Sequence, residues 1–145
     1  MPTGTDAEPG DVLLLDTSAA VALVVEDHEA HAAVLDAVRG RRVGLAGHAW
    51  FETYSVLTRL PGVLRRPPAE LAVLLAHDFP ASAFLTADAA SALGPELARL
   101  GVSGGAVYDA LVGAAAREHG LALVSCDVRA QPVYEALGVR VLPAG

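Results

Sequence analysis

The chain has 145 residues, of which 53% are hydrophobic and 19% are charged, a composition that fits one globular domain with a buried core and excludes a largely disordered chain. Its apolar runs are interrupted by Asp16 and by Glu26 and Asp27, well short of the ~20 residues that a membrane-spanning helix needs. The single cysteine excludes an internal disulfide, and we therefore expect a cytoplasmic protein without membrane contact. The absence of lysine excludes the lysine-dependent phosphate loop of many nucleotide-binding proteins.

Short apolar runs alternate with longer helical patterns along the chain. The runs predict five strands, at residues 12–15, 43–46, 83–85, 121–125 and 139–142. The segments between them predict helices over residues 18–39 with a break near Glu26, and over 49–60, 68–77, 87–100, 105–119 and 131–137. Gly101, Gly120 and Gly138 stand where left-handed caps end helices.

This alternation predicts an α/β fold. We expect a single domain over residues 12–145, after a flexible N-terminal tail at residues 1–11. The domain should contain a mostly parallel central sheet of about five strands flanked by helices. In such sheets ligands bind at the carboxyl ends of the strands, so the residues that follow each strand are the first candidates for a functional site.

Two of the predicted strands end in an acid. Asp16 follows the first strand, in the run LLLDTSAA, and Asp127 closes the run LALVSCD. Asp16, Thr17 or Ser18 can cap the helix that follows, so a purely structural role for Asp16 stays open beside a role in a site. Because the carboxyl ends of parallel strands share one edge, we expect Asp16 and Asp127 to lie at the same rim.

Two further acids lie on helices that are otherwise largely apolar. Asp109 falls in the first turns of the predicted helix 105–119, and Glu52 falls on the predicted helix 49–60. A solvent-facing position near a helix N-terminus is the alternative for Asp109, and a salt bridge to Arg59 is the alternative for Glu52. Carboxylates gathered at one rim would repel one another unless a cation neutralises them, and oxygen-preferring Mg²⁺ or Mn²⁺ is the usual cation.

Four segments that carry these acids resemble a known family. The segments LLLDTSAAVAL, GHAWFETYSVLTRLPG, GGAVYDALVGAAAREHG and LVSCDVRAQPVYEALGVRVL are together similar to the PIN domain, and more closely to the VapC-type toxins of bacterial VapBC toxin–antitoxin pairs. The resemblance extends from Val12 to Leu142. Each segment alone is a weak signal, but four acids in the order Asp, Glu, Asp, Asp with these flanks form a specific combination.

The resemblance implies a metal-dependent endoribonuclease that acts as a toxin and has a cognate protein antitoxin. It implies that one or two Mg²⁺ or Mn²⁺ ions are bound by an acidic quartet that is both catalytic and metal-binding: Asp16, Glu52, Asp109 and Asp127. An ion held by the three aspartates would activate a water molecule for attack on an RNA phosphodiester. Glu52 would orient that water or complete a second ion site.

Hydroxyl side chains beside the acids are expected to support this site. Ser125 matches a position where the family often has Thr before its last acid, and Thr17 and Ser18 follow the first acid directly. Cys126 departs from the family pattern, in which a basic or polar residue is common. This departure concerns substrate contacts and leaves the acidic quartet complete.

The net charge of −7 is unusual for a protein that binds a polyanion. Arg59, Arg65 and Arg66 follow Glu52 on the same helix and its continuation, and we predict that they contact RNA phosphates, with ordinary solvated surface as the alternative. The large apolar side chains near the rim, such as Trp50 and Phe51, predict a homodimer, with core packing as the alternative.

Rival functions differ in what they require of the acids. A PIN-like module that binds RNA and regulates it without cutting is the main alternative, and the presence of all four acids favours the enzyme. A phosphatase or a nuclease acting on DNA is a further alternative, which a substrate panel with added Mg²⁺ or Mn²⁺ distinguishes.

Overall fold

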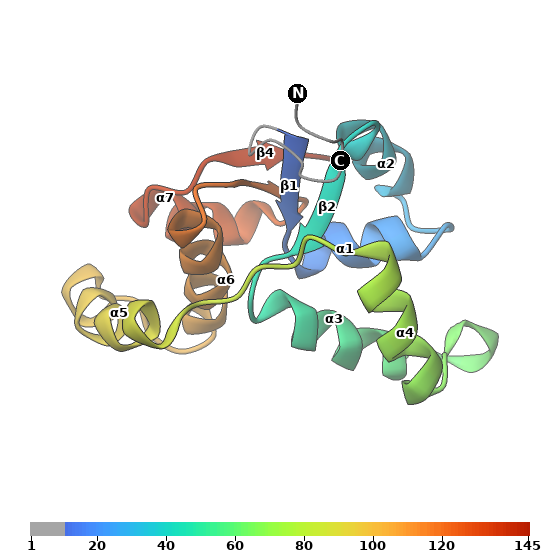
Figure 1. Cartoon of the computed structure of the whole chain (residues 1–145), viewed down its shortest axis with the longest axis horizontal. Coiled ribbons are helices and arrows are strands. Elements are labelled where there is room, and N and C mark those ends of the chain that lie inside the picture. The colour runs from blue at the N-terminus through green and yellow to red at the C-terminus, as the bar shows by residue number, and fades with distance from the viewer. Residues whose placement is uncertain (1–10) are drawn as a thin grey trace, which may run out of the picture.

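A computed structural model describes residues 11–145 and has a four-stranded parallel sheet at its centre (Figure 1). The strands lie in the order β2-β1-β3-β4. Their bounds are β1 (Val12–Leu15), β2 (Arg42–Leu45), β3 (Ala122–Ser125) and β4 (Val141–Pro143). All neighbouring strands are parallel, so their carboxyl ends share one edge, as the sequence predicts. The predicted tail at residues 1–11 lies, apart from Asp11, outside the described residues.

Helices cover both faces of this sheet. The α-helices are α1 (Thr17–Val24), α2 (His31–Val38), α3 (Ala49–Thr58), α4 (Pro68–Asp78), α5 (Ala87–Leu100), α6 (Ala106–Glu118) and α7 (Gln131–Ala136), with short 3-10 turns η2 (Gly62–Leu64) and η3 (Val128–Ala130). The predicted break near Glu26 is confirmed, because separate helices α1 and α2 replace one long helix. The left-handed glycines predicted after three helices are confirmed at Gly101, Gly120 and Gly138. No helix in the described part of the chain is long and apolar enough to span a membrane.

The two central strands, β1 and β3, bury both of their faces, which explains why their sequences are continuous apolar runs. Successive side chains of a strand point to opposite faces. In β1, Leu13 and Leu15 accordingly belong to the core under α1, α2, α3 and α4, whereas Leu14 belongs to the core under α6 and α7. β3 divides in the same way, with Val124 on the first side and Leu123 on the second. The domain therefore has three layers, with the sheet between two groups of helices (Figure 1).

The predicted fifth strand at residues 83–85 is wrong, and the sheet has four strands. The segment beside β2 makes only an isolated parallel bridge between Ala46 and Ala83. The amide of Leu45 donates to the side-chain oxygen of Ser82 at 2.9 Å, so a side chain takes the place of a strand partner's carbonyl. The backbone at Ala81 approaches Gly44 so closely that a Cβ atom on Gly44 would collide with it. Residues 81–83 therefore lie along the edge of β2, where the backbone N–H groups of Ala81 and Ala83 donate to the carbonyls of Val43 and Leu45, but they form no regular strand.

Candidate active site

Asp16 is held by three hydrogen bonds at the end of β1. Its Oδ1 accepts the backbone N–H of Ala19 at 3.0 Å and the hydroxyl of Ser18 at 2.6 Å. Its Oδ2 accepts the hydroxyl of Tyr134 at 2.9 Å. Asp16 is the N-cap of α1, and its side chain is buried. Asp16 therefore has the capping role that the sequence left open. It also accepts the Tyr134 hydroxyl, a contact that capping does not require.

Two serines fix the carboxyl ends of the central strands. The hydroxyl oxygen of Ser18 accepts the backbone N–H of Cys126 at 2.9 Å, while the same hydroxyl donates to Asp16. The hydroxyl oxygen of Ser125 accepts the backbone N–H of Asp127 at 3.0 Å. The Ser18 contact ties the turn after β1 to the turn after β3, and the Ser125 contact orders the backbone of the turn that carries Asp127.

Asp127 pairs with Arg129, a residue that the sequence analysis does not single out and whose one local signal is its closeness to the acid. Its Oδ1 accepts the backbone N–H of Arg129 at 3.0 Å, and its Oδ2 lies 3.5 Å from the guanidinium of the same residue. The Arg129 side chain is largely exposed. A positive charge therefore lies beside the last acid of the quartet.

Glu52 lies in the first turn of α3 and contacts one residue of α1 and one residue just before α3. Its Oε2 accepts the hydroxyl of Thr17 at 3.3 Å, and its Oε1 lies 3.3 Å from Nε2 of His48. The alternative of a salt bridge to Arg59 is not realised, because the Arg59 Nε donates to the carbonyl of Ser55. His48 precedes Glu52 by four residues, one helical turn, which is the only sequence signal for this contact.

Asp109 is the acid whose electrostatics link the quartet. Burial raises the pKa of its carboxyl, and the negative charge of Asp127 raises it further, against an opposing effect of Arg129. Glu52 and Asp16 also raise the pKa of Asp109. The other three predicted acids are therefore within electrostatic reach of Asp109.

Two neighbouring cavities open beside the acids. One has a volume of about 600 Å³ and is lined by Glu52, Asp109, His48, Tyr108 and Arg129, among others. The second, of about 690 Å³, is lined by Asp127 together with Thr17, Ser18 and Cys126, among others. Three acids of the quartet therefore line hollows large enough for a small ligand, and Asp16 is buried between the strand ends.

The donor chemistry of the quartet suits a divalent cation. Four carboxylates supply the hard oxygen ligands that Mg²⁺ and Mn²⁺ prefer, and a cation would relieve the repulsion that raises the pKa of Asp109. Within residues 11–145, no three acidic, histidine or cysteine side chains form a ready-made ion site. Asp16, Glu52 and Asp127 are engaged with Tyr134, His48 and Arg129 instead. Because each carboxylate offers about four lone-pair sites, these contacts leave oxygen lone pairs with which the same acids could bind an ion.

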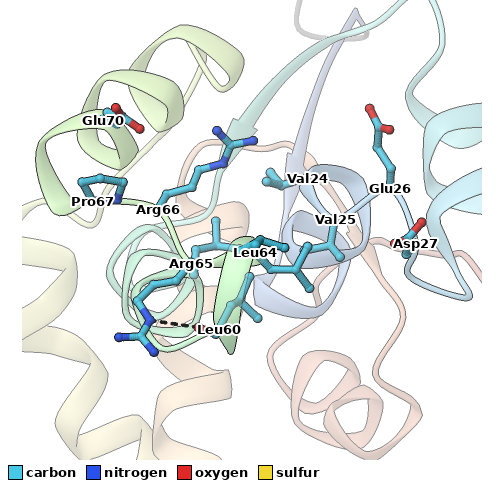
Figure 2. Close-up of a pocket in the computed structure, with 12 residues that line it drawn as sticks. Val24, Val25, Glu26, Asp27, Leu60, Leu64, Arg65, Arg66, Pro67 and Glu70 are labelled. Carbon is cyan, nitrogen blue, oxygen red and sulfur yellow. Dashed lines mark hydrogen bonds between the residues drawn. The ribbon is translucent and has the colours of Figure 1, made fainter.

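The three predicted RNA-binding arginines lie toward the other end of α3. Arg65 and Arg66 line a separate cavity of about 500 Å³ between the end of α1 and the start of α4 (Figure 2). The two guanidinium groups point in different directions, and Arg65 donates from Nε to the carbonyl of Leu60 at 3.1 Å (Figure 2). None of the four acids lines this cavity. Arg59 caps the end of α3.

The model of one protein family, described as the PIN domain, matches residues 13–136. The chain therefore belongs to the PIN-domain family, and the four acids lie at the carboxyl edge of its sheet.

Within this family the chain is similar to VapC proteins. It is 48% identical over 132 residues to Ribonuclease VapC27 of Mycobacterium tuberculosis strain H37Rv, an alignment that covers 91% of this chain and 96% of that protein. It is 46% identical over 128 residues to Ribonuclease VapC40 of the same species, covering 87% of this chain and 94% of the relative. The resemblance to VapC-type PIN proteins is thus confirmed.

Solved structures share the fold at low sequence identity. A structure of FitAB bound to an IR36 DNA fragment aligns with a TM-score of 0.64 and 19% identity, over 90% of this chain and 94% of the other. A structure of VapBC2 from Rickettsia felis bound to a DNA fragment from its promoter aligns with a TM-score of 0.63 and 11% identity, over 92% and 99% of the two chains. At these identities the comparison establishes the fold alone.

Proposed function

We propose that the protein is a metal-dependent endoribonuclease and the toxin of a toxin–antitoxin pair, which hydrolyses RNA phosphodiester bonds and so inhibits translation or growth. The observation that carries this proposal is geometric: Glu52 and Asp109 line one cavity, and Asp16 and Asp127 follow the neighbouring parallel strands β1 and β3 at one edge of the sheet. The close relatives named as VapC ribonucleases support the same activity.

The acids have distinct tasks in this proposal. Asp16, Asp109 and Asp127 would hold an Mg²⁺ or Mn²⁺ ion, which when bound supplies a water of lowered pKa and stabilises charge on the phosphate. Glu52, already contacted by Thr17 and His48, would orient the attacking water or complete a second ion site. The chain needs no nucleophilic side chain for this hydrolysis.

The protein would act in the cytoplasm with a protein antitoxin as its inhibitor. The relation to VapC proteins supports an antitoxin partner, since one structural neighbour is a VapBC assembly. Homodimerisation stays a prediction. Trp50 and Tyr54 pack against the core, as the alternative foresaw, but Phe51 and Phe84 are exposed with ring centroids 6.2 Å apart. This exposed pair supports an interface with a second chain.

A substrate panel tests the proposal. Purified protein would be incubated with single-stranded RNA, duplex RNA, DNA and a phosphomonoester, in Mg²⁺, in Mn²⁺ or in excess EDTA. We expect cleavage of RNA only with a divalent cation, loss of cleavage in Asp109→Asn, and retained cleavage in Asp88→Asn, a control acid exposed on α5. RNA that is bound but never cut would support the non-cleaving module instead. Cleavage in excess EDTA would contradict the metal mechanism.

A further inference from the structure

The cavity beside the acids has an aromatic wall that the proposed hydrolysis does not use. The ring of His48, just before α3, stacks on the ring of Tyr108 in the first turn of α6, with centroids 5.2 Å apart and an angle of 23° between the planes. Both residues line the cavity of about 600 Å³. Tyr108 is still 53% exposed, so much of its surface faces solvent. An exposed aromatic surface within a cavity suits a flat, apolar ligand.

This aromatic pair is tied to the acids. Nε2 of His48 lies 3.3 Å from Oε1 of Glu52, and Tyr108 directly precedes Asp109 on α6. Any ligand that stacks on the pair is therefore held next to two of the four acids. Since the positions of both rings are set by the same helices that carry the acids, the stacking surface and the reacting site share one rigid support.

The remaining lining of the cavity matches one class of ligand. Gly105 and Ala106 are small and leave room beside the aromatic pair, while Arg129 brings a positive charge to the cavity. A ligand that combines a flat ring with a neighbouring negative charge fits these features. A nucleotide of a polynucleotide chain has both, because an aromatic side chain stacks on its base and a guanidinium pairs with its phosphate.

We propose that His48 and Tyr108 form a stacking platform for one unpaired base of the RNA, next to the phosphate that is cut, with Arg129 facing the RNA backbone. The proposal rests on the function proposed above and specifies its substrate. A base inside a duplex has both faces covered by its neighbours, so the platform selects single-stranded segments or loops. Because every base offers a π face, the platform contributes affinity with little sequence preference.

The test compares variants that distinguish the effect of an aromatic face from the effect of side-chain size. Tyr108→Leu keeps an apolar side chain without a π face, Tyr108→Phe keeps the face, and Phe84→Leu is a matched control at an exposed aromatic outside the cavity. Each variant would be made in an Asp16→Asn background, in which RNA stays intact while Asn preserves the helix cap. The probe is a ten-nucleotide single-stranded RNA with 2-aminopurine at each position in turn.

We expect Tyr108→Leu to weaken binding of this RNA by roughly 5- to 150-fold and to abolish the quenching of 2-aminopurine at one position. Tyr108→Phe and Phe84→Leu should leave both readouts unchanged, and duplex RNA should bind equally to all variants. Leucine is a better helix former than tyrosine, so α6 should remain folded, as circular dichroism would verify.

Unchanged RNA affinity and quenching in folded Tyr108→Leu would overturn the platform. A change in oligomeric state in sedimentation, with RNA binding unaffected, would overturn it too and would assign Tyr108 to a protein contact. Wild-type protein that cuts no RNA with either cation would overturn the proposed function itself, so the two failures are distinguishable.

Discussion

The hydroxyl of Tyr134 donates a 2.9 Å hydrogen bond to Oδ2 of Asp16, joining α7 to the end of β1 between two buried side chains. The Tyr134 ring fits against Gly113 of α6, where a Cβ atom would lie only 3.0 Å from the ring. Burial raises the pKa of the Tyr134 hydroxyl, and the charge of Asp16 raises it further, so the hydroxyl stays protonated and donates. A buried tyrosine thus holds the orientation of the first acid.

Tyr134→Phe should therefore disturb the site as well as the fold. The change removes one donor from a buried carboxylate, which costs about 1–3 kcal/mol of unfolding free energy. We expect a lower urea midpoint and weaker Mn²⁺ binding by calorimetry, because Asp16 loses a contact that orients it. Tyr54→Phe is the control, since the Tyr54 hydroxyl makes no hydrogen bond within the described residues and its ring stacks on Trp50. Equal Mn²⁺ affinity in both variants would show that Tyr134 only fills space.

Asp109→Asn should abolish RNA cleavage while stabilising the metal-free protein. The pKa of Asp109 is raised in the folded state, so its ionised form is disfavoured there relative to the unfolded chain. The charge therefore lowers stability at neutral pH, and the penalty disappears below the ordinary aspartate pKa of 3.8, where both states are protonated. Melting curves in EDTA should show a higher Tm for the variant at pH 7, with a difference that shrinks toward acid pH. The exposed control Asp88→Asn should show no such gain. A lower Tm for Asp109→Asn at pH 7 would contradict the prediction that the ionised Asp109 carboxylate destabilises the metal-free fold.

Substitution of the arginines at and beyond the end of α3 tests where RNA leaves the site. If Arg59, Arg65 and Arg66 contact phosphates, replacing each with Ala should weaken RNA binding regardless of sequence. Each lost contact should also flatten the slope of log affinity against log salt by roughly 0.7 for a single strand. A salt titration in the Asp109→Asn background measures this, with Arg99→Ala on α5 as the control. If all three variants keep the parental affinity and salt slope, the prediction is wrong and the RNA lies elsewhere. Arg39, Arg41 and Arg42 are then the next candidates.

Gly44→Ala should destabilise the fold through a steric contact that only the structure reveals. A methyl group there would collide with the backbone at Ala81, and such overpacking typically costs about 1–3 kcal/mol. Gly94→Ala is a matched control, because nothing lies within 4 Å of its Cβ position in α5. We expect the control to gain about 0.5–1 kcal/mol from helix propensity. Similar urea midpoints for the two variants would contradict the close approach at β2.

The sequence alone determined the order of the elements and the positions of the acids. Apolar runs and terminal glycines are local signals, so β1, β3 and most helix ends could be predicted from neighbouring residues. The same signals placed Asp16 and Asp127 at strand ends, and parallel topology then required a common edge. Asp109 and Glu52 were recognisable because they interrupt apolar helices.

Only the tertiary structure decided how many strands the sheet has and which partners the acids take. The segment at residues 83–85 has the apolar composition of a strand, but it makes an isolated bridge to β2 instead of a regular ladder, and the Ser82 hydroxyl oxygen accepts the Leu45 amide in place of a strand carbonyl. Tyr134 reaches Asp16, and Thr17 reaches Glu52, from helices distant in the chain. Hydrogen bonds and stacking between such segments depend on how layers pack, and no local pattern of residues encodes that packing.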